Sequence, residues 1–155
     1  MVKIALVDDH QIVRDGIKSL LEGQKGVEVV AEAENAQEFF SKLIDIVPDI
    51  AIVDISLPGM SGIDLTKQLS DTHPNIKVIM LSMYTTQEFN FNAIKAGAKG
   101  YLPKNITQLE LIEAIANVNE GKEYFSKDIS EVILKNYLKQ IKNRLVALYL
   151  ANHQI

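Results

Sequence analysis

Short apolar runs alternate along the chain with longer segments in which apolar residues recur every three or four positions. The runs are rich in Val and Ile and predict strands at 2–7, 27–33, 49–54, 76–82 and 99–102. The segments between and after them predict helices at 10–22, 36–46, 61–71, 85–97 and 107–121. A strand followed by a helix, repeated in this way, is typical of an open α/β domain with a parallel sheet.

Local signals predict where several helices begin and end. Ser61 is an expected N-cap, and Thr107 with Glu110 fits a capping box. Gly97 is the expected C-terminal residue of its helix, because glycine readily adopts the left-handed conformation found there. Helical spacing also predicts the inward positions of the first two helices, which are Ile12, Val13, Ile17, Leu20, Leu21, Phe39, Phe40, Leu43 and Ile44.

Polar side chains follow four of the predicted strands at their carboxyl ends. Asp8 and Asp9 follow the first strand, Asp54 ends the third, Ser82 ends the fourth and Lys104 follows the fifth. In an open parallel sheet this edge carries the functional site. Each residue alone has an ordinary explanation as a cap, a turn residue or a solvated lysine, but together they predict one site.

The chemistry of that predicted site favours a magnesium ion and a phosphoryl group. Three neighbouring carboxylates repel one another, and a hard divalent cation such as Mg²⁺ relieves the repulsion. A cation, an ammonium and a hydroxyl suit the peripheral oxygens of a phosphoryl group in transfer. Asp54 would then be the attacking carboxylate.

Composition narrows the class of protein further. The 155 residues are 47% apolar, enough for a core, and the net charge of −4 makes this chain a poor candidate for nucleic-acid binding. Cysteine is absent, which excludes disulfides and Cys-ligated zinc. The sequence shows neither a signal peptide nor a stretch of the roughly 18 apolar residues that a membrane span needs, so we expect a cytoplasmic protein.

Four stretches, "LVDDH", "IVDISLPGMSGIDL", "IMLS" and "AGAKGYLPK", resemble in order and spacing the receiver domain of two-component response regulators. The resemblance covers roughly residues 2–121. It implies a flavodoxin-like, doubly wound, five-stranded parallel sheet of order 2-1-3-4-5, with helices on both faces. "DDH" and "GAKGYL" lean toward the subgroup whose full-length members carry a C-terminal helix-turn-helix.

The resemblance also implies a role for each candidate residue. Asp54 is the phosphoacceptor. Mg²⁺ binds the side chains of Asp9 and Asp54 and the backbone carbonyl of Ser56, with Asp8 acting through water. The remaining implied roles are switch or phosphate contacts at Ser82, Tyr101 and Lys104, and tuning of dephosphorylation at Ser56 and Tyr84. Asn105 stands where many receivers have a proline with a cis peptide bond, so the geometry after Lys104 is left open.

The function implied is a switch rather than an enzyme. The chain would take a phosphoryl group from a sensor histidine kinase or phosphotransfer protein. It would then change the face formed by its fourth helix, fifth strand and fifth helix to control transcription output or dimerisation. Two alternatives remain: a Mg²⁺-dependent aspartyl-phosphate phosphohydrolase, whose expected second acid is replaced by Ser56, and an interaction module that never takes phosphate.

His10, next to Asp9, has two interpretations. It is either a metal ligand or, as we favour, a residue at the start of a helix near the kinase-docking face.

The chain after Gly121 is too short for a helix-turn-helix domain. We therefore divide the protein into a receiver domain at 1–121 and a helical linker or dimerisation tail at 122–155, with DNA binding only through an output domain that these residues do not contain. One helix is expected from about Ser126 or Asp128. A heptad seam runs along it through Leu134, Leu138, Ile141, Leu145 and Leu148. The tail would dimerise, pack on its own receiver, or represent a linker cut short; we favour a homodimer.

Overall fold

The computed structural model describes residues 1–83 and 91–153. The described strands are β1 (Val2–Val7), β2 (Val27–Ala33), β3 (Ile50–Asp54), β4 (Lys77–Ser82), β5 (Gly100–Pro103) and β6 (Tyr124–Phe125). The helices are α1 (Gln11–Leu21), α2 (Ala36–Lys42), α3 (Gly62–Thr72), α4 (Phe91–Lys95), α5 (Gln108–Asn119) and α6 (Lys127–Asn152).

The strands form one parallel sheet of order β2-β1-β3-β4-β5-β6. The predicted α/β class and the order 2-1-3-4-5 are therefore confirmed. The sixth strand was not predicted. It pairs with β5 through Gly100 and Tyr101, which lie opposite Tyr124 and Phe125.

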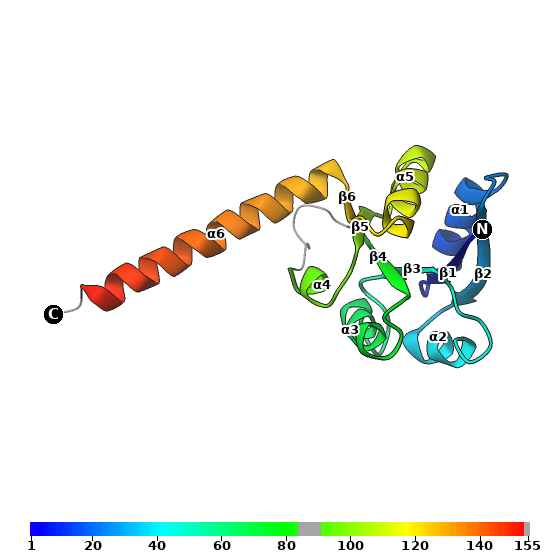
Figure 1. The fold of residues 1–155 in the computed structure, drawn as a ribbon, viewed down its shortest axis with the longest axis horizontal. Coiled ribbons are helices and arrows are strands. Elements are labelled where there is room, and N and C mark those ends of the chain that lie inside the picture. The colour runs from blue at the N-terminus through cyan, green and yellow to red at the C-terminus, as the bar shows by residue number, and fades with distance from the viewer. Residues whose placement is uncertain (84–90, 154–155) are drawn as a thin grey trace.

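Two helical layers cover the sheet, with α1 and α5 on one face and α2, α3 and α4 on the other (Figure 1). Successive strand residues point to opposite faces, so each strand supplies both layers. In β3, for example, Ile50 and Ile52 pack toward α1 and α5, whereas Ala51 and Val53 pack toward the other layer. This two-sided burial explains why the central strands are continuous apolar runs.

The predicted caps are present. The Ser61 side chain accepts a hydrogen bond from the Asp64 amide at 3.1 Å, and Thr107 accepts one from the Glu110 amide at 3.2 Å. Gly97 has a φ of +110° just beyond α4. These contacts fix the starts of α3 and α5, which follow the strands that end near Asp54 and Lys104.

Two predicted inward positions are wrong. Ile12 is 82% exposed and Ile44 is 84% exposed. Helix α2 ends at Lys42, so Ile44 lies beyond the helix and is not part of its apolar stripe. On α1 the buried side instead carries Arg14, Ile17 and Leu21, which turns Ile12 toward solvent.

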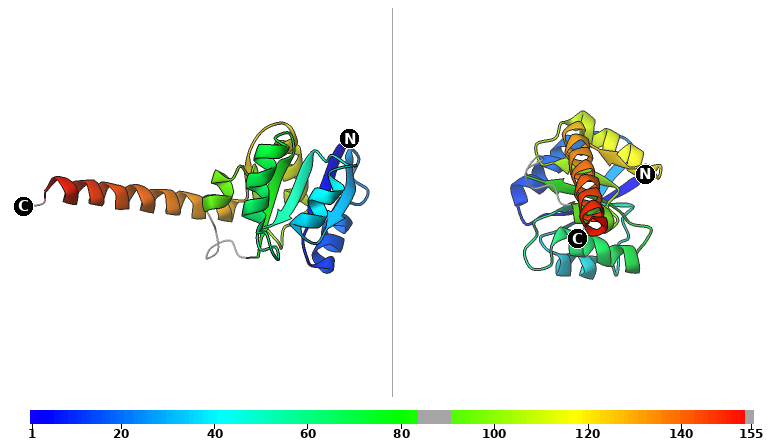
Figure 2. Two further views of the ribbon diagram at one scale, coloured as in Figure 1. Left: turned by 90° about the horizontal axis from the view of Figure 1, so that it is seen from below. Right: turned by 90° about the vertical axis from the view of Figure 1, so that its left-hand side faces the viewer.

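Helix α6 leaves the sheet at β6 and extends away from the rest of the molecule as one continuous helix (Figures 1 and 2). In the described part of the chain, the contact between α6 and the core lies in the first turns of the helix, where Ile133 and Phe125 pack against the same cluster of buried residues. In the described part of the chain, no helix has both the length and the apolar character that crossing a membrane requires.

Candidate functional site

The carboxyl ends of β1, β3, β4 and β5 bring most of the predicted site residues together. Asp54, the last residue of β3, is 1% exposed, and Asp8, which follows β1, is 2% exposed. The Lys104 ammonium lies 2.9 Å from Asp54 Oδ2 and 3.2 Å from Asp8 Oδ2. A lysine whose side chain is 10% exposed therefore bridges two buried carboxylates from different strands.

The ammonium is held in its charged form. Burial by itself would lower the pKa of Lys104, but its hydrogen bond to Asp54 and the charges of Asp54 and Asp8 raise that pKa above its ordinary value. The site thus contains a fixed positive charge directly against the Asp54 carboxylate.

The loop after β3 holds Asp54 from the other side. The Ser56 amide donates to Asp54 Oδ1 at 3.0 Å, so each carboxylate oxygen of Asp54 has a donor. Gly62, the first residue of α3, lies so close to this turn that an added Cβ would be 2.3 Å from the Asp54 carbonyl oxygen. Only glycine lets the start of α3 approach the Asp54 backbone this closely.

Asp8, Asp9, His10 and Asp54 form one group of possible metal ligands. One ligand atom from each lies within 4.8 Å of those of the others. Asp8 Oδ2 is buried and accepts no hydrogen bond from the described residues, although Lys104 lies within ion-pair distance. Oxygen-rich donors of this kind fit Mg²⁺, which prefers carboxylate and carbonyl oxygens.

His10 occupies the N-cap position of α1, as the helix-start interpretation requires. Its amide donates to Asp8 Oδ1 at 2.8 Å, and its Nδ1 atom lies 3.2 Å from both Asp8 Oδ1 and Asp9 Oδ1. The imidazole therefore borders the acidic group, with its side chain 57% exposed.

Ser82 and Tyr101, the expected switch residues, are both fully buried. Ser82 ends β4, and its carbonyl accepts a hydrogen bond from the Lys104 amide at 2.8 Å. Tyr101 points inward into the core on the α4 side of the sheet, in the same cluster as Ala93. Tyr84 lies outside the described residues. No peptide bond among the described residues is cis, so the bond after Lys104 is trans.

Arg14 is a site-bordering residue that sequence reasoning missed. Its side chain is 95% buried, and its guanidinium donates to the Asp8 carbonyl and pairs with Glu32 through Nε at 3.1 Å. The sequence did carry a signal for it: Arg14 shares the i, i+3, i+7 helical spacing with the apolar residues Ile17 and Leu21. A cation on such an apolar stripe is buried with the helix face and therefore needs a buried partner. Lys18, one turn later, also pairs with Glu32 at 2.9 Å.

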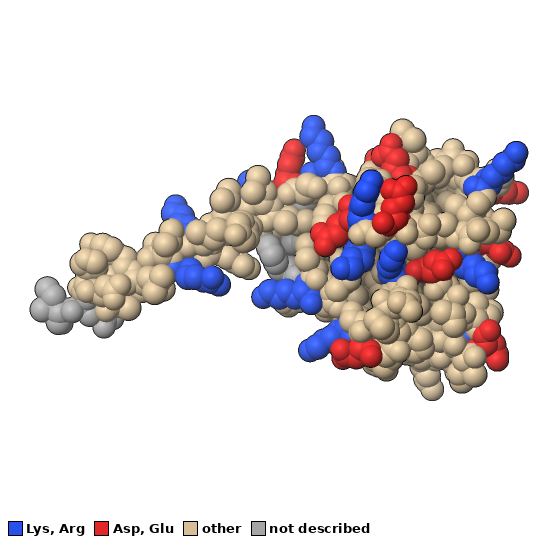
Figure 3. Space-filling model, viewed as in Figure 1, with Lys and Arg blue, Asp and Glu red and all other residues tan. Residues whose placement is uncertain are grey.

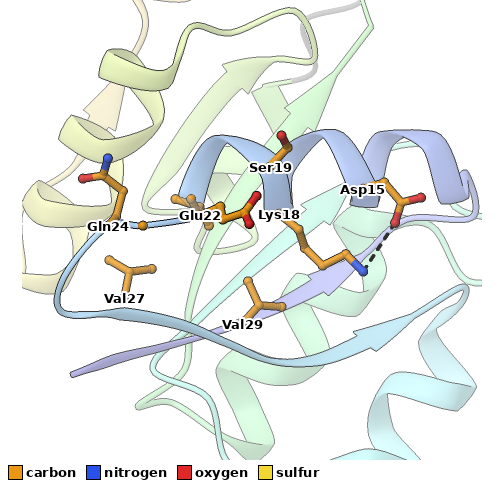
Figure 4. Close-up of a pocket in the computed structure, with 9 residues that line it drawn as sticks. Asp15, Lys18, Ser19, Glu22, Gln24, Val27 and Val29 are labelled. Carbon is orange, nitrogen blue, oxygen red and sulfur yellow. Dashed lines mark ion pairs between the residues drawn. The ribbon is translucent and has the colours of Figure 1, made fainter.

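Two surface hollows flank α1. One, of about 370 Å³, opens beside Lys104 and is lined by apolar residues that include Ile12, Leu81 and Ile106. The other, of about 490 Å³, lies between α1 and β2 around Asp15, Lys18 and Val29 (Figure 4). Among the predicted site residues, Lys104 lines the first hollow and none lines the second, so the first hollow is the one that borders the acidic group.

Comparisons with known proteins identify the family. Residues 4–116 match the response regulator receiver domain. The response regulator GacA of Pseudomonas syringae pv. syringae is 33% identical over 144 residues, which cover 92% of this chain and 67% of GacA.

Two solved structures extend the similarity. A LuxR-family response regulator from Aurantimonas sp. has a TM-score of 0.82 at 35% identity, covering 89% of this chain and 99% of that one. The isolated receiver of RcsB from Salmonella enterica serovar Typhimurium, solved with the phosphomimetic BeF3−, has a TM-score of 0.77 at 27% identity, covering 84% and 97%. The chain spans about two thirds of the length of GacA, and the shared part is longer than the receiver match at residues 4–116. The protein therefore belongs to the receiver-domain family of two-component response regulators, with LuxR-type regulators among its relatives.

Proposed function

We propose that this receiver accepts a phosphoryl group on Asp54 from a histidine kinase or phosphotransfer protein and acts as a phosphorylation-controlled switch. The observation that carries the proposal is the buried Asp54 carboxylate, 2.9 Å from the Lys104 ammonium and beside Asp8 and Asp9. A nucleophile in this setting has its negative charge and that of the incoming group compensated before reaction.

Mg²⁺ would be held by Asp9, Asp54 and the backbone carbonyl of Ser56, with Asp8 contributing through water. The donor set supports this, because it is dominated by carboxylate oxygens. When bound, the ion supplies positive charge that offsets the phosphoryl oxygens. Imidazole is a less suitable donor for Mg²⁺, so His10 is assigned to the start of α1 rather than to the metal.

The transfer step uses the groups already in place. An Asp54 oxygen attacks phosphorus in line, the phosphorus–nitrogen bond of the donor phosphohistidine breaks, and the bonding electrons stay on the imidazole. Lys104 Nζ moves from the carboxylates to a phosphoryl oxygen, and the Ser82 hydroxyl donates to another. Both contacts are stronger to the doubly charged phosphoryl group than to a carboxylate.

The signal leaves the site through β4 and β5. The Ser82 carbonyl accepts from the Lys104 amide, and Met80 lies opposite Tyr101 in the β4–β5 ladder. A phosphoryl group that recruits Ser82 and Lys104 would therefore favour one position of Tyr101, the inward one. The α4–β5–α5 face would change with it, and transcription output or self-association would follow.

The hollow beside Lys104 supports docking of the phosphodonor on α1. Ile12 is 82% exposed at its rim, next to Ile106. An apolar residue in this place suits burial against a partner whose phosphohistidine must reach Asp54.

The phosphorylated state should be long-lived. The position two residues beyond Asp54 carries Ser56, whose side chain is too short to orient a hydrolytic water, and Tyr84 would shield the other side of the path. A lasting signal fits a switch better than a phosphohydrolase, which must release its phosphate repeatedly.

Acetyl phosphate with Mg²⁺, followed by intact-mass measurement, tests the proposal. We expect a retained gain of one phosphoryl group in the wild type and in Asp71→Ala, an exposed-acid control, but none in Asp54→Ala. Phosphate release without a retained group would favour the phosphohydrolase, and no reaction would favour a phosphate-independent module. Decay after removal of the donor then measures the lifetime, and decay faster in the wild type than in Tyr84→Glu would contradict the shielding role.

A further inference from the structure

The projecting part of α6 carries an apolar face in contact with solvent. Leu134, Leu138, Leu145 and Leu148 are between 54% and 61% exposed. Figure 3 shows this helix as a largely uncharged surface interrupted by Lys and Arg. Four half-exposed leucines on one helix are an unfavourable arrangement in water and indicate an interface.

The described residues of the receiver do not cover this face. The helix is attached through β6 and Ile133, which packs on the core, whereas Leu134 is 58% exposed one residue later. From there the helix runs clear of the receiver (Figures 1 and 2). Among the described residues nothing covers the apolar face, and a second copy of the same helix would present a matching one.

We propose that α6 pairs with α6 of a second copy of this chain as a parallel two-stranded coiled coil. The seam is Leu134, Leu138, Ile141, Leu145 and Leu148, whose spacings of 4, 3, 4 and 3 place them alternately at d and a positions of one continuous helix. This association does not depend on phosphorylation of Asp54.

The residues that flank the seam select two strands. The e positions hold Lys135, Lys142 and Tyr149, and the g positions include Tyr137 and Arg144. All five are exposed in the single chain. A bundle of more strands would bury these basic side chains without acidic partners, because the described helix has no acidic residue after Glu131. A two-stranded arrangement leaves them solvated.

The same flanking residues select the parallel direction. In a parallel pair each g residue faces the e residue five positions later on the partner helix, which matches Tyr137 with Lys142 and Arg144 with Tyr149. These are cation–aromatic pairs and are attractive. In an antiparallel pair e positions face e positions, so lysines face lysines and repel. A parallel pair also places both receivers at the same end.

Sedimentation equilibrium of the full chain tests the association. The seam spans little more than two heptads, so we expect a dimer with a roughly micromolar dissociation constant. Leu138→Asp with Leu145→Asp should raise that constant about 100-fold or more, because two apolar layers are replaced by charges. Leu150→Asp is the matched control: its side chain is equally exposed at 55% but lies off the seam, so dimerisation should persist.

Cysteine cross-linking tests the direction, and the chain has no native cysteine to interfere. Leu134→Cys should form a covalent dimer readily on oxidation, since the two residues face each other only in the parallel arrangement. In antiparallel pairs that preserve the seam they would lie more than about 15 Å apart.

A monomeric wild type, a dimer unaffected by the seam variants, or failure of Leu134→Cys to cross-link would each overturn the proposal. The Asp54→Ala variant should dimerise like the wild type. A failed phosphorylation experiment and a failed coiled coil are therefore distinguishable.

Discussion

At the residue scale, the buried guanidinium of Arg14 connects the acidic site to the edge of the sheet. It links the Asp8 carbonyl at the end of β1 to the Glu32 carboxylate on β2. Its burial makes it a structural requirement for the position of Asp8, because a buried polar group without its partner is costly.

Arg14→Ala should lower the free energy of unfolding by about 3 kcal/mol, because it leaves the Asp8 carbonyl and one side of Glu32 without their donor. Urea denaturation measures the change. Lys18→Ala is the control, since Lys18 pairs with the same Glu32 from the surface. Surface ion pairs contribute little to the free energy of unfolding, so this variant should lose less stability than Arg14→Ala. Equal losses in the two variants would show that Arg14 is not the buried anchor.

Glu32 should make the free energy of unfolding fall as the pH becomes acidic. Its hydrogen bond to Lys18, reinforced by Arg14, lowers the pKa of the Glu32 carboxyl below its ordinary value despite partial burial. A carboxyl with a lowered folded-state pKa stabilises the fold above its unfolded pKa of about 4.3, and that contribution disappears as pH falls through the folded-state value.

The stability difference between wild type and Glu32→Gln should therefore be largest near neutral pH and shrink below about pH 4.3. Thermal unfolding across this range measures it. Glu28→Gln is the control on the same strand, because Glu28 is exposed and belongs to no ion pair among the described residues. A difference that grew toward acid pH would contradict the assignment.

At the element scale, the close approach of α3 to β3 positions the loop that carries Asp54. Gly62→Ala should destabilise the protein by about 1–3 kcal/mol and slow phosphorylation by acetyl phosphate, because its Cβ would overlap the Asp54 backbone.

Gly16→Ala is the control for the helical position. Gly16 lies inside α1, and beyond its chain neighbours and the backbone of its own helix no atom lies within 4 Å of an added Cβ, so alanine should stabilise the helix by about 0.5–1 kcal/mol. Opposite signs in the two glycine variants are the expected result, measured by denaturant unfolding. Destabilisation by both would point to a general intolerance of substitution.

The exposed side of α1 should bind the phosphodonor protein and take no part in the reaction at Asp54. The test needs a histidine-kinase domain that phosphorylates the wild type. Ile12→Asp should slow phosphoryl transfer from that domain by about tenfold or more, because apolar contact with the kinase is lost. Its rate with acetyl phosphate should be unchanged, since Ile12 is 82% exposed and outside the acidic group. Equal loss with both donors would place the defect in the site itself.

The elements show what apolar periodicity can and cannot predict. The central strands were predictable because burial on both faces makes Ile50 to Val53 continuously apolar. Asp54 and Lys104 could be placed together because carboxyl ends of parallel strands share one edge. Strand β6 is only Tyr124–Phe125, too short to produce a periodic signal, and it exists because the edge of β5 offers free backbone groups. Ile12 was misassigned because Arg14 replaces an apolar residue on the buried stripe.

At the scale of the whole molecule, a bound divalent cation should add to global stability. Mg²⁺ at ten times its dissociation constant should raise the free energy of unfolding by about 1.4 kcal/mol, since it binds the folded acidic group and not the unfolded chain. Thermal scans with and without Mg²⁺ measure a rise of roughly 2–5 °C. Asp9→Ala should abolish the dependence on Mg²⁺, whereas the exposed-acid variant Asp71→Ala should keep it. The same rise in Asp9→Ala would argue against the assigned ligands.

The start of α6 is hydrogen-bonded to β5, the strand that carries Tyr101. The Ser126 amide donates to the Tyr101 carbonyl at 3.4 Å, and α6 starts at the next residue. A helix of 26 residues is about 39 Å long, so a tilt of about 5° at its base would displace its far end by about 3 Å. A sub-ångström adjustment of β5 would thus reach the distal end of the tail as a movement comparable to the width of a side chain.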